Sequence, residues 1–467
     1  MILTRNSIQK KYLNKKIFKS FSKEFNKIFN NLDINLDSSK TTLDILSKKF
    51  KFNFKSQDLK KFKKFKKIAI IGMGGSILGT EAIYYFLKQK IKKEIYFFDN
   101  IDTEKLIKFK KLNDAKKTLF LVISKSGNTV ETLANFLSLN LVKKNAKNII
   151  VISEKKNSPL YLLSKKFNLF LVEHKSYIGG RYSVLSEVGM LPAYLFGLNI
   201  IQLRKNIRKY FLGKHRSFLR DSSIKLASLI KQKKINSLIF LNYAPKLDKF
   251  LFWCQQLIGE SLGKKTKGFL PVVSPAPKDH HSLLQLYLDG PKDKLFCFFS
   301  AKIKTNNKIN SKKYSKNIDY LNNKSLENIK DAQRKALIQT FKKHKVPFRE
   351  FIIKKLDEKT LSELFSYFIL ETVMIGKLIK VNPFDQPSVE QVKIATKKIL
   401  KSLENKGLEE KLEKSQMEKI ILVEVPKTVY PEIRSTLIFL FEKSGFKDVN
   451  LQKEVDFEKL YLSKKSQ

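Results

Sequence analysis

The sequence predicts an α/β protein built from two doubly wound parallel sheets. Short apolar runs of buried-strand type, separated by helical patterns, occur at residues 68–71, 95–98, 118–123, 148–152 and 169–172. A second series lies further along the chain, at residues 237–241, 295–299 and 348–353. Alternating strands and helices form parallel sheets with helices on both faces, so we expect one domain at residues 66–214 and another at residues 215–403.

The two ends of the chain fall outside these series. Residues 1–65 carry scattered Phe, Ile and Leu between lysines, which predicts an N-terminal extension of short helices over the body. Residues 404–467 form a helical C-terminal extension that begins with a polar segment at residues 404–419. Within it a helical pattern runs to Lys443, and short apolar runs at 420–425 and 449–451 indicate a strand on either side. The sequence assigns this extension no function.

Composition places the chain among globular proteins. Its 467 residues are enough for two or three hydrophobic cores, and 42% of them are hydrophobic. The 93 Lys and Arg outnumber the 43 Asp and Glu, and the formal charge of +50 suits nucleic acid, an acidic membrane surface or anionic metabolites. The lysines are spread along the whole chain, which favours the codon usage of an AT-rich source over a specific nucleic-acid partner.

Cysteine and hydropathy patterns indicate a reducing compartment. The two cysteines, Cys254 and Cys297, lie in apolar surroundings and suggest neither a disulfide framework nor a metal cluster. Residues 1–16 lack the continuous apolar core of a signal peptide. The most apolar long window, residues 361–379, is interrupted by charged residues, including Glu371. We therefore expect a cytoplasmic protein that does not span a membrane.

A glycine turn follows the first predicted strand. Gly72-Met-Gly-Gly-Ser76 leads into a helical pattern, and glycines let backbone amides approach an anion at a helix N-terminus. The motif therefore suits phosphate or a phosphosugar. A dinucleotide fold is the alternative, because Asp99 ends the next strand, where a ribose-binding acid could lie. The dinucleotide fingerprint fails at Ile77, which stands where its third glycine should be.

The third predicted strand is followed by a segment rich in hydroxyl groups. Ser124-Lys-Ser-Gly-Asn-Thr129 opens a helix, and Asn128 and Glu131 have the spacing of a capping box. Hydroxyl donors, free backbone amides and the helix dipole all favour a dianionic phosphate, and Lys125 adds a positive charge. The alternative is a helix cap that binds nothing.

Two further residues suit the chemical step, one as an anion-binding cation and one as a base. Arg181, within Gly179-Gly-Arg-Tyr-Ser183, can hold a carboxylate, a phosphate or a developing enediolate, although the motif equally fits a structural turn with an exposed Arg. Glu260 lies near the end of a helix that presents Leu257 on its apolar face and ends near Gly263. Partial burial among apolar groups would make this carboxylate a stronger base, whereas the alternative is a surface Glu at a helix terminus.

The remaining candidates lie in the second half of the chain. His280 and His281 occupy a Pro-rich loop that suits acid–base work, although a lone His is more often structural. Two adjacent histidines do not make a metal site without further ligands. Asp385-Gln-Pro387 has the form of a helix start with Pro in its first turn. Gln386 and Lys393 would then share one helix face, roughly 10 Å apart, unless Lys393 is simply a solvated lysine.

Six blocks of the chain resemble the glucose-6-phosphate isomerase family of two-domain sugar isomerases. They occur in the family's order and span most of the chain. The blocks are Gly72–Ser76, Ser124–Thr129, Gly179–Ser183, Gly259–Ser261, Asp279–Gln285 and Asn382–Lys393. The resemblance implies two sugar-isomerase domains and a cofactor-free, metal-free aldose–ketose isomerisation of a hexose 6-phosphate. It also implies the residues that hold the substrate phosphate, which are Ser124, Lys125, Ser126 and Thr129, with Ser76 close by.

The resemblance further implies the catalytic roles. Glu260 would move the proton between C1 and C2, and Arg181 would stabilise the enediolate. Gln386 would contact the substrate. His281 and Lys393 would assist ring opening, with His281 supplied by the neighbouring subunit of a homodimer.

Other functions stay open from the sequence alone. A non-catalytic sugar-phosphate sensor on the same fold would keep the phosphate loop and lose the base, whereas Glu260, Arg181, His281 and Lys393 are all present. A nucleic-acid-binding protein is suggested only by the charge. The sequence also leaves open whether mannose 6-phosphate is a further substrate.

Overall fold

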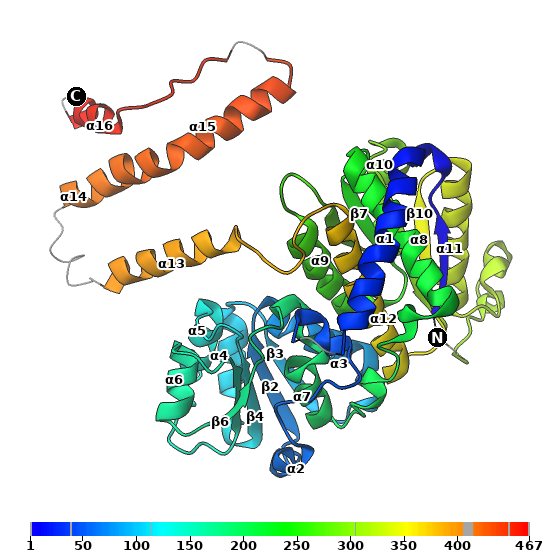
Figure 1. Ribbon diagram of the computed structural model, residues 1–467, viewed down its shortest axis with the longest axis horizontal. Coiled ribbons are helices and arrows are strands. Elements are labelled where there is room, and N and C mark those ends of the chain that lie inside the picture. Colours follow the sequence, from blue (N-terminus) through cyan, green and yellow to red (C-terminus); the bar gives the residue numbers. More distant parts are fainter. Residues whose placement is uncertain are drawn as a thin grey trace. The chain divides into compact units, whose positions relative to one another are not determined.

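The computed structural model describes residues 2–37, 40–112, 114–303, 305–404, 414–446 and 449–465. The chain separates into two compact units, residues 1–385 and residues 386–467. Within the first unit, two sheets with helices packed on them carry the motifs that precede Gln386 (Figure 1).

The first sheet is formed by the five strands predicted between residues 67 and 173. Its strands run parallel in the order β3-β2-β4-β5-β6, and each lies within one residue of its predicted bounds. Ile70 and Ile71 of β2 face two different cores, and both are fully buried. Burial on both faces explains why these strands are continuous apolar runs. The strands are β2 (Lys67–Gly72), β3 (Glu94–Phe98), β4 (Thr118–Ile123), β5 (Ile149–Ser153) and β6 (Phe170–Glu173). The helices of this region are α3 (Leu78–Leu87), α4 (Thr103–Lys111), α5 (Val130–Ser138), α6 (Pro159–Lys166) and α7 (Glu187–Leu195).

The second sheet has the order β1-β10-β9-β7-β8, with β7 to β10 parallel and β1 antiparallel to β10. The three predicted strands are confirmed, as β7 (Ser237–Asn242), β9 (Lys294–Ala301) and β10 (Phe348–Ile353). The two edge strands, β1 (Ile2–Ser7) and β8 (Leu270–Pro275), were not predicted. Edge strand β1 is polar at four of its positions, and β8 contains two prolines, so neither gives the apolar run of a central strand.

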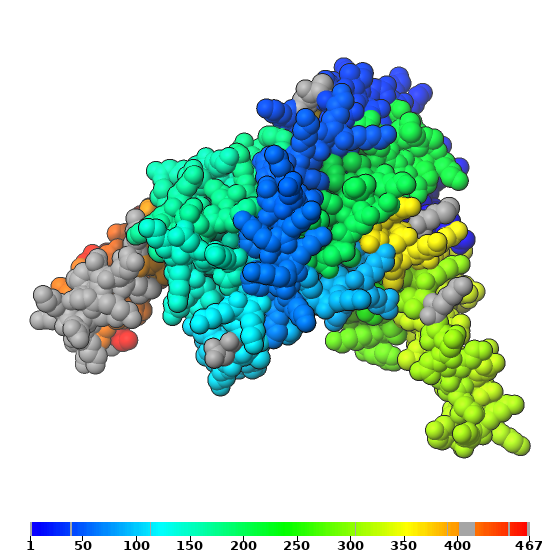
Figure 2. Space-filling model, turned by 90° about the horizontal axis from the view of Figure 1, so that it is seen from below, coloured from blue at the N-terminus to red at the C-terminus, as the bar shows by residue number. Residues whose placement is uncertain are grey.

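The N-terminal extension is helical in part, as predicted, but it also supplies β1 to the second sheet. The helices of this half of the unit are α1 (Lys15–Asn35), α8 (Gly213–Gln232), α9 (Asp248–Leu262), α10 (Leu284–Asp289), α11 (Leu326–Lys343) and α12 (Glu358–Leu378), while the short α2 (Ser56–Leu59) precedes β2. Helix α9 packs against α3, which ties the two halves together. Residues 305–325, between β9 and α11, stand off from the rest of the unit (Figure 2, yellow-green).

In both sheets the strand order reverses at the first parallel strand. Strand β2 lies between β3 and β4, and β7 lies between β8 and β9. In open α/β sheets, ligands bind outside the carboxyl ends of the strands at such a point. The segments that follow β2 and β4 are the glycine turn and the hydroxyl-rich loop. The fold therefore brings both predicted anion sites to one edge of the first sheet.

The second unit consists of helices in the residues that are described. They are α13 (Val389–Glu404), α14 (Lys414–Lys419), a π-helical segment (Ile420–Glu424), α15 (Val425–Lys443) and α16 (Phe457–Lys465). The strands predicted at 420–425 and 449–451 are wrong. The first run is helical, because a short apolar run alone does not distinguish a strand from a helix, and the second has no regular secondary structure. Part of the predicted polar segment, residues 405–413, lies outside the described residues. Among the described helices, none is both long enough and apolar enough to cross a membrane.

Candidate active site

The glycine turn after β2 packs closely against the loop that carries Arg181. A Cβ atom on Gly75 would lie only 2.2 Å from the carbonyl carbon of Gly180, so the two backbones meet at a distance that only glycine permits. Gly74 has a φ of +51°, which also favours glycine. Ser76 closes the turn and is half-buried. Two of the predicted blocks, far apart in sequence, are thus in contact.

Arg181 is buried at the centre of the site, with 2% of its side chain exposed. Its Nη1 donates to Oε1 of Glu260 at 2.8 Å, and its Nε donates to Oγ of Ser261 at 2.7 Å. Its Nη2 donates to the backbone carbonyls of Pro383 and Asp385 at 2.7 and 3.0 Å. The alternative of an exposed turn Arg is therefore wrong. The guanidinium instead joins three of the six predicted blocks.

Glu260 lies in the last turns of α9, and 20% of its side chain is exposed. The carboxylate has two polar neighbours: Oε1 is paired with Arg181, and Oε2 accepts from Nε2 of Gln256 at 3.0 Å. The expected apolar surroundings are thus replaced by a cation and an amide, which hold the carboxylate in one orientation. Gln256 was not predicted, although its i,i+4 spacing from Glu260 on a helix was the available signal. It also contacts the glycine turn, because a Cβ on Gly74 would lie 2.8 Å from its Nε2.

The loop after β4 is organised by its own hydroxyl groups. Oγ of Ser124 lies 3.0 Å from Oγ1 of Thr129 and accepts from the amide of Gly127 at 3.1 Å. Oγ of Ser126 accepts from the amide of Asn128 at 3.2 Å. Gly127 has a φ of +66°. The predicted capping box is wrong: α5 begins at Val130, and its N-cap residue Thr129 makes no side-chain cap bond. These hydroxyls and the uncapped helix start can bind an anion.

Lys125 carries the positive charge of this loop and is held beside a carboxylate. Its Nζ lies 3.6 Å from Oε1 of Glu154, whose Oε2 is paired with Nζ of Lys156 at 2.7 Å. Burial lowers the pKa of Lys125 below its usual value, the charges of Lys156 and Arg181 lower it further, and Glu154 opposes them. Glu154 and buried His174, whose pKa burial lowers to about 4, were not predicted.

The two adjacent histidines have different surroundings. His280 points its Nε2 at the hydroxyl of Tyr243, 2.6 Å away. The side chain of His281 is exposed, and within the described part of the chain its ring has no hydrogen-bond partner. His281 is therefore the histidine whose ring is available to a substrate or to another subunit. Its role in the site stays a prediction.

Gln386 and Lys393 belong to the second unit. Helix α13 begins at Val389, so Gln386 and Pro387 precede it and Lys393 lies within it. The predicted placement of Gln386 and Lys393 on one helix face is therefore wrong, because the helix starts three residues after Gln386. The participation of both residues in the site stays a prediction. Among the described residues, no group of three or more His, Cys, Asp or Glu side chains could hold a metal ion.

The geometry brings together an anion loop, a buried cation and an oriented carboxylate, and it agrees with the comparison to known families. Residues 37–420 match the family model of phosphoglucose isomerase. The chain belongs to this family. Residues 408–467 also match the family model of the preprotein translocase subunit SecB, a match confined to the second unit.

Relatives support the membership, and a solved structure shares the fold. The chain is 30% identical over 355 residues to glucose-6-phosphate isomerase of Methanocaldococcus jannaschii, covering 72% of this chain and 86% of that one. It is 34% identical over 357 residues to glucose-6-phosphate isomerase of Mycoplasmopsis pulmonis, covering 71% and 82%. The fold matches a crystal structure of glucose-6-phosphate isomerase from Chlamydia trachomatis with a TM-score of 0.68, at 17% identity and over 86% of this chain and 89% of that one.

Proposed function

We propose that this member of the phosphoglucose isomerase family interconverts glucose 6-phosphate and fructose 6-phosphate. The observation that carries the proposal is the Glu260 carboxylate, which Arg181 and Gln256 hold in one orientation. A base fixed in this way, in a unit that also carries a phosphate-type loop, suits proton transfer on a phosphorylated sugar. We extend the proposal to a cytoplasmic role in glycolysis and gluconeogenesis, with sugar-isomerase domains at residues 66–214 and 215–403.

In the proposed reaction the substrate phosphate is bound by the hydroxyls of Ser124, Ser126 and Thr129 and by the ammonium of Lys125, with Ser76 beside them. Because phosphate binding is remote from C1 and C2, its energy helps to hold the reacting carbons against the base. His281 and Lys393 assist ring opening, and Gln386 contacts the sugar.

The ion pair between Arg181 and Glu260 suits the chemical step. In the forward direction Glu260 removes the proton from C2, and the negative charge moves from the carboxylate to the oxygens of the cis-enediolate. Glu260 then returns the proton to C1, and the hydroxyl proton of O2 passes to O1, so that the carbonyl group moves from C1 to C2. Since Arg181 is already fixed by Ser261 and two carbonyls, it stays in place while the charge moves, and it stabilises the enediolate as it stabilised the carboxylate.

The test is a coupled assay of the purified full-length chain for conversion of fructose 6-phosphate to glucose 6-phosphate, with and without a chelator. We expect turnover that the chelator does not change. Glucose 6-phosphate binding without turnover would replace the proposal with a sugar-phosphate sensor. The same assay with mannose 6-phosphate decides whether that sugar is also a substrate.

We further propose a homodimer in which the exposed His281 serves the neighbouring site. His281→Ala and Glu260→Gln are then each inactive as homodimers, but a mixed dimer has one site with both lesions and one with neither. Random exchange of equal amounts gives half mixed dimers, so about a quarter of wild-type activity per chain should return. Mixed dimers that form, as checked by sedimentation, and stay inactive would place His281 in its own subunit's site.

A further inference from the structure

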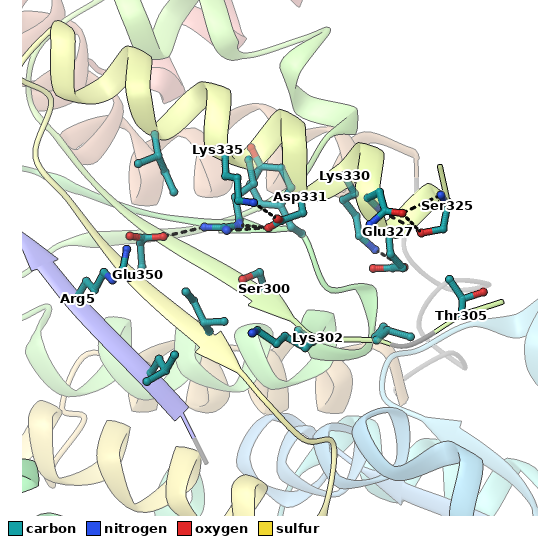
Figure 3. Close-up of a pocket in the computed structure, with 18 of the residues that line it drawn as sticks. Arg5, Ser300, Lys302, Thr305, Ser325, Glu327, Lys330, Asp331, Lys335 and Glu350 are labelled. Atoms are coloured by element: carbon teal, nitrogen blue, oxygen red, sulfur yellow. Dashed lines mark hydrogen bonds and ion pairs between the residues drawn. The ribbon is translucent and has the colours of Figure 1, made fainter. Parts of the chain in front are cut away.

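A groove of about 880 Å³ lies on the second sheet, on the face that α11 covers. Its sheet side is formed by β1, β10 and the end of β9, and its other side by α11. Figure 3 shows Arg5 on the strand side, Lys302 at the end of β9, and Lys330 and Lys335 on the helix. The volume falls within the range typical of small-molecule sites.

The groove runs along β1 and β10 and reaches, at Tyr243 and Lys302, the strand ends that correspond to those of β2 and β4 in the first sheet. Strand β7 lies between β8 and β9, as β2 lies between β3 and β4. Tyr243, the residue after β7, and Lys302, the residue after β9, both line the groove. It is therefore open at the carboxyl ends of the strands on either side of the reversal, where α/β sheets bind ligands.

Among the described residues that line the groove, the charged side chains without an ion-pair partner are all positive. Each lining carboxylate is already paired: Glu327 with Lys330, Asp331 with Arg334 and Lys335, and Glu350 with Arg334. Three lining cations come from three different elements, Arg5 from β1, Lys302 from the end of β9 and Lys342 from α11. None of these three side chains has a hydrogen-bond or ion-pair partner within the described residues. Apolar side chains, among them Leu3 and Ile338, complete the lining.

One wall residue connects the groove to the histidine loop. Tyr243 is almost fully buried, and its hydroxyl lies 2.6 Å from Nε2 of His280. His281, the histidine assigned to ring opening, is the next residue. A ligand that moves Tyr243 therefore acts on the backbone that positions His281.

We propose that this groove is a regulatory site for a small phosphorylated molecule with two or more phosphate groups, and that its occupancy alters turnover through Tyr243 and His280. Arg5 and Lys302, two unpaired cations on separate elements that line one groove, favour a compact polyanion over a single phosphate. The coupling to turnover rests on the proposed isomerase function, whereas binding itself does not.

The test uses inorganic pyrophosphate as the probe and the full-length chain. Calorimetry of the wild type should show binding of pyrophosphate. The same binding should remain in Lys125→Ala/Thr129→Val, a variant in which the phosphate loop is impaired. In Arg5→Gln/Lys302→Gln the affinity of that site should fall at least about tenfold. The matched control is Lys312→Gln/Lys313→Gln, which removes the same charge from the neighbouring segment outside the groove and should leave the affinity within about twofold.

Kinetics then test the coupling. Pyrophosphate that only competes at the phosphate loop raises KM and leaves kcat unchanged, whereas occupancy of the groove should change kcat by about twofold or more. Tyr243→Phe keeps the ring and removes the bond to His280, so it should bind pyrophosphate and lose the kcat effect. The site would be overturned if the control variant lost as much affinity for pyrophosphate as Arg5→Gln/Lys302→Gln. It would also be overturned if arbitrary DNA bound to the groove as well as pyrophosphate does. An unchanged kcat with intact binding would overturn the coupling, and absence of isomerase turnover would instead overturn the proposed function.

Discussion

The two sheets of residues 1–385 share one strand order around their first parallel strand and differ in the loops at the carboxyl ends of their strands. After β2 and β4 the first sheet has a glycine turn and a six-residue loop in which hydroxyls bond to backbone amides. After β7 and β9 the second sheet has the buried Tyr243 and a long segment that leads to α11. In the first sheet the helix after the loop starts without a side-chain cap, whereas Ser325 and Asn328 close α11 with a capping box.

This difference shows how one topology takes two roles. In the first sheet the helix start and its hydroxyls are left for an anion. In the second sheet the start of α11 is capped by Ser325 and Asn328. An anion there can therefore bind only to the cations that line the groove. The fold determines where ligands collect, and the loops determine which ligands can bind. The comparison predicts that substitutions at equivalent places in the two sheets have unequal effects on turnover.

The largest effect is expected for Glu260→Gln, which keeps the shape of the side chain and removes the base. A general base contributes about 10²- to 10⁴-fold, so kcat should fall by that factor while sugar-phosphate affinity stays within about tenfold. Proton exchange at C2 of bound substrate should vanish with it. The matched control is Glu327→Gln on the second sheet's groove, which should leave kcat unchanged. A Glu260→Gln enzyme with more than about a tenth of wild-type kcat would place the base elsewhere.

The second expectation concerns stability and a cation in the core beside the second sheet. Arg349 of β10 is fully buried and donates to Oε1 of Glu371 at 2.5 Å, and Tyr367 donates to the same oxygen at 2.6 Å. Arg349→Met leaves the Glu371 carboxylate buried without its cation and should cost about 3–5 kcal/mol in the first urea-unfolding transition. The double variant Arg349→Met/Glu371→Leu should recover most of that loss. If both variants lose the same free energy of unfolding, the unpaired Glu371 carboxylate is not the cause of the loss.

The third expectation compares two lysines that follow equivalent strands. Lys125→Ala after β4 should lower kcat/KM for glucose 6-phosphate about 10- to 150-fold, since a charge-assisted contact to phosphate contributes about 1.5–3 kcal/mol. Thr129→Val should act in the same direction by removing a hydroxyl donor. Lys302→Ala after β9 should leave kcat/KM within about twofold when pyrophosphate is absent. Equal losses in the two lysine variants would remove the distinction between the sheets.

The sequence predicted the parts of this comparison that depend on local pattern. Buried strands of the first sheet were found within a residue because both faces are apolar, as at Ile70 and Ile71. The edge strands β1 and β8 were missed because half-polar or proline-containing strands leave no such run. The segment at 420–425 was assigned to the wrong element because its apolar run is as compatible with a helix.

The candidate site shows the same limit. The blocks around Arg181 and Glu260 were predicted, but the contact between them was not, since it joins residues 79 apart in the chain. Gln256 and Glu154 were missed because their roles depend on which side chain the fold brings beside them. The capping box at Asn128 failed because α5 begins at Val130 with Thr129 as its N-cap residue, a starting point that the spacing of residue types alone does not determine.

The smallest effect is expected for Glu154→Gln, and its sign distinguishes the phosphate loop from a passive helix cap. Glu154 competes with substrate phosphate for Lys125, so at pH 7 the variant should lower KM by about 1.4- to 5-fold, the value of a partly exposed ion pair. At alkaline pH the sign reverses. Phosphate binding needs the Lys125 ammonium. Burial lowers the pKa of Lys125 below 10.5, and Glu154 partly opposes this. In the wild type KM should therefore begin to rise before the pH reaches 10.5, and in Glu154→Gln the rise should begin at a lower pH. His174, with a pKa of about 4, stays neutral throughout. The control is Glu94→Gln, because Glu94 is paired with Lys67 and not with Lys125. Its alkaline rise in KM should match that of the wild type. If the rise in KM of Glu154→Gln is not shifted in pH, Lys125 does not bind the phosphate.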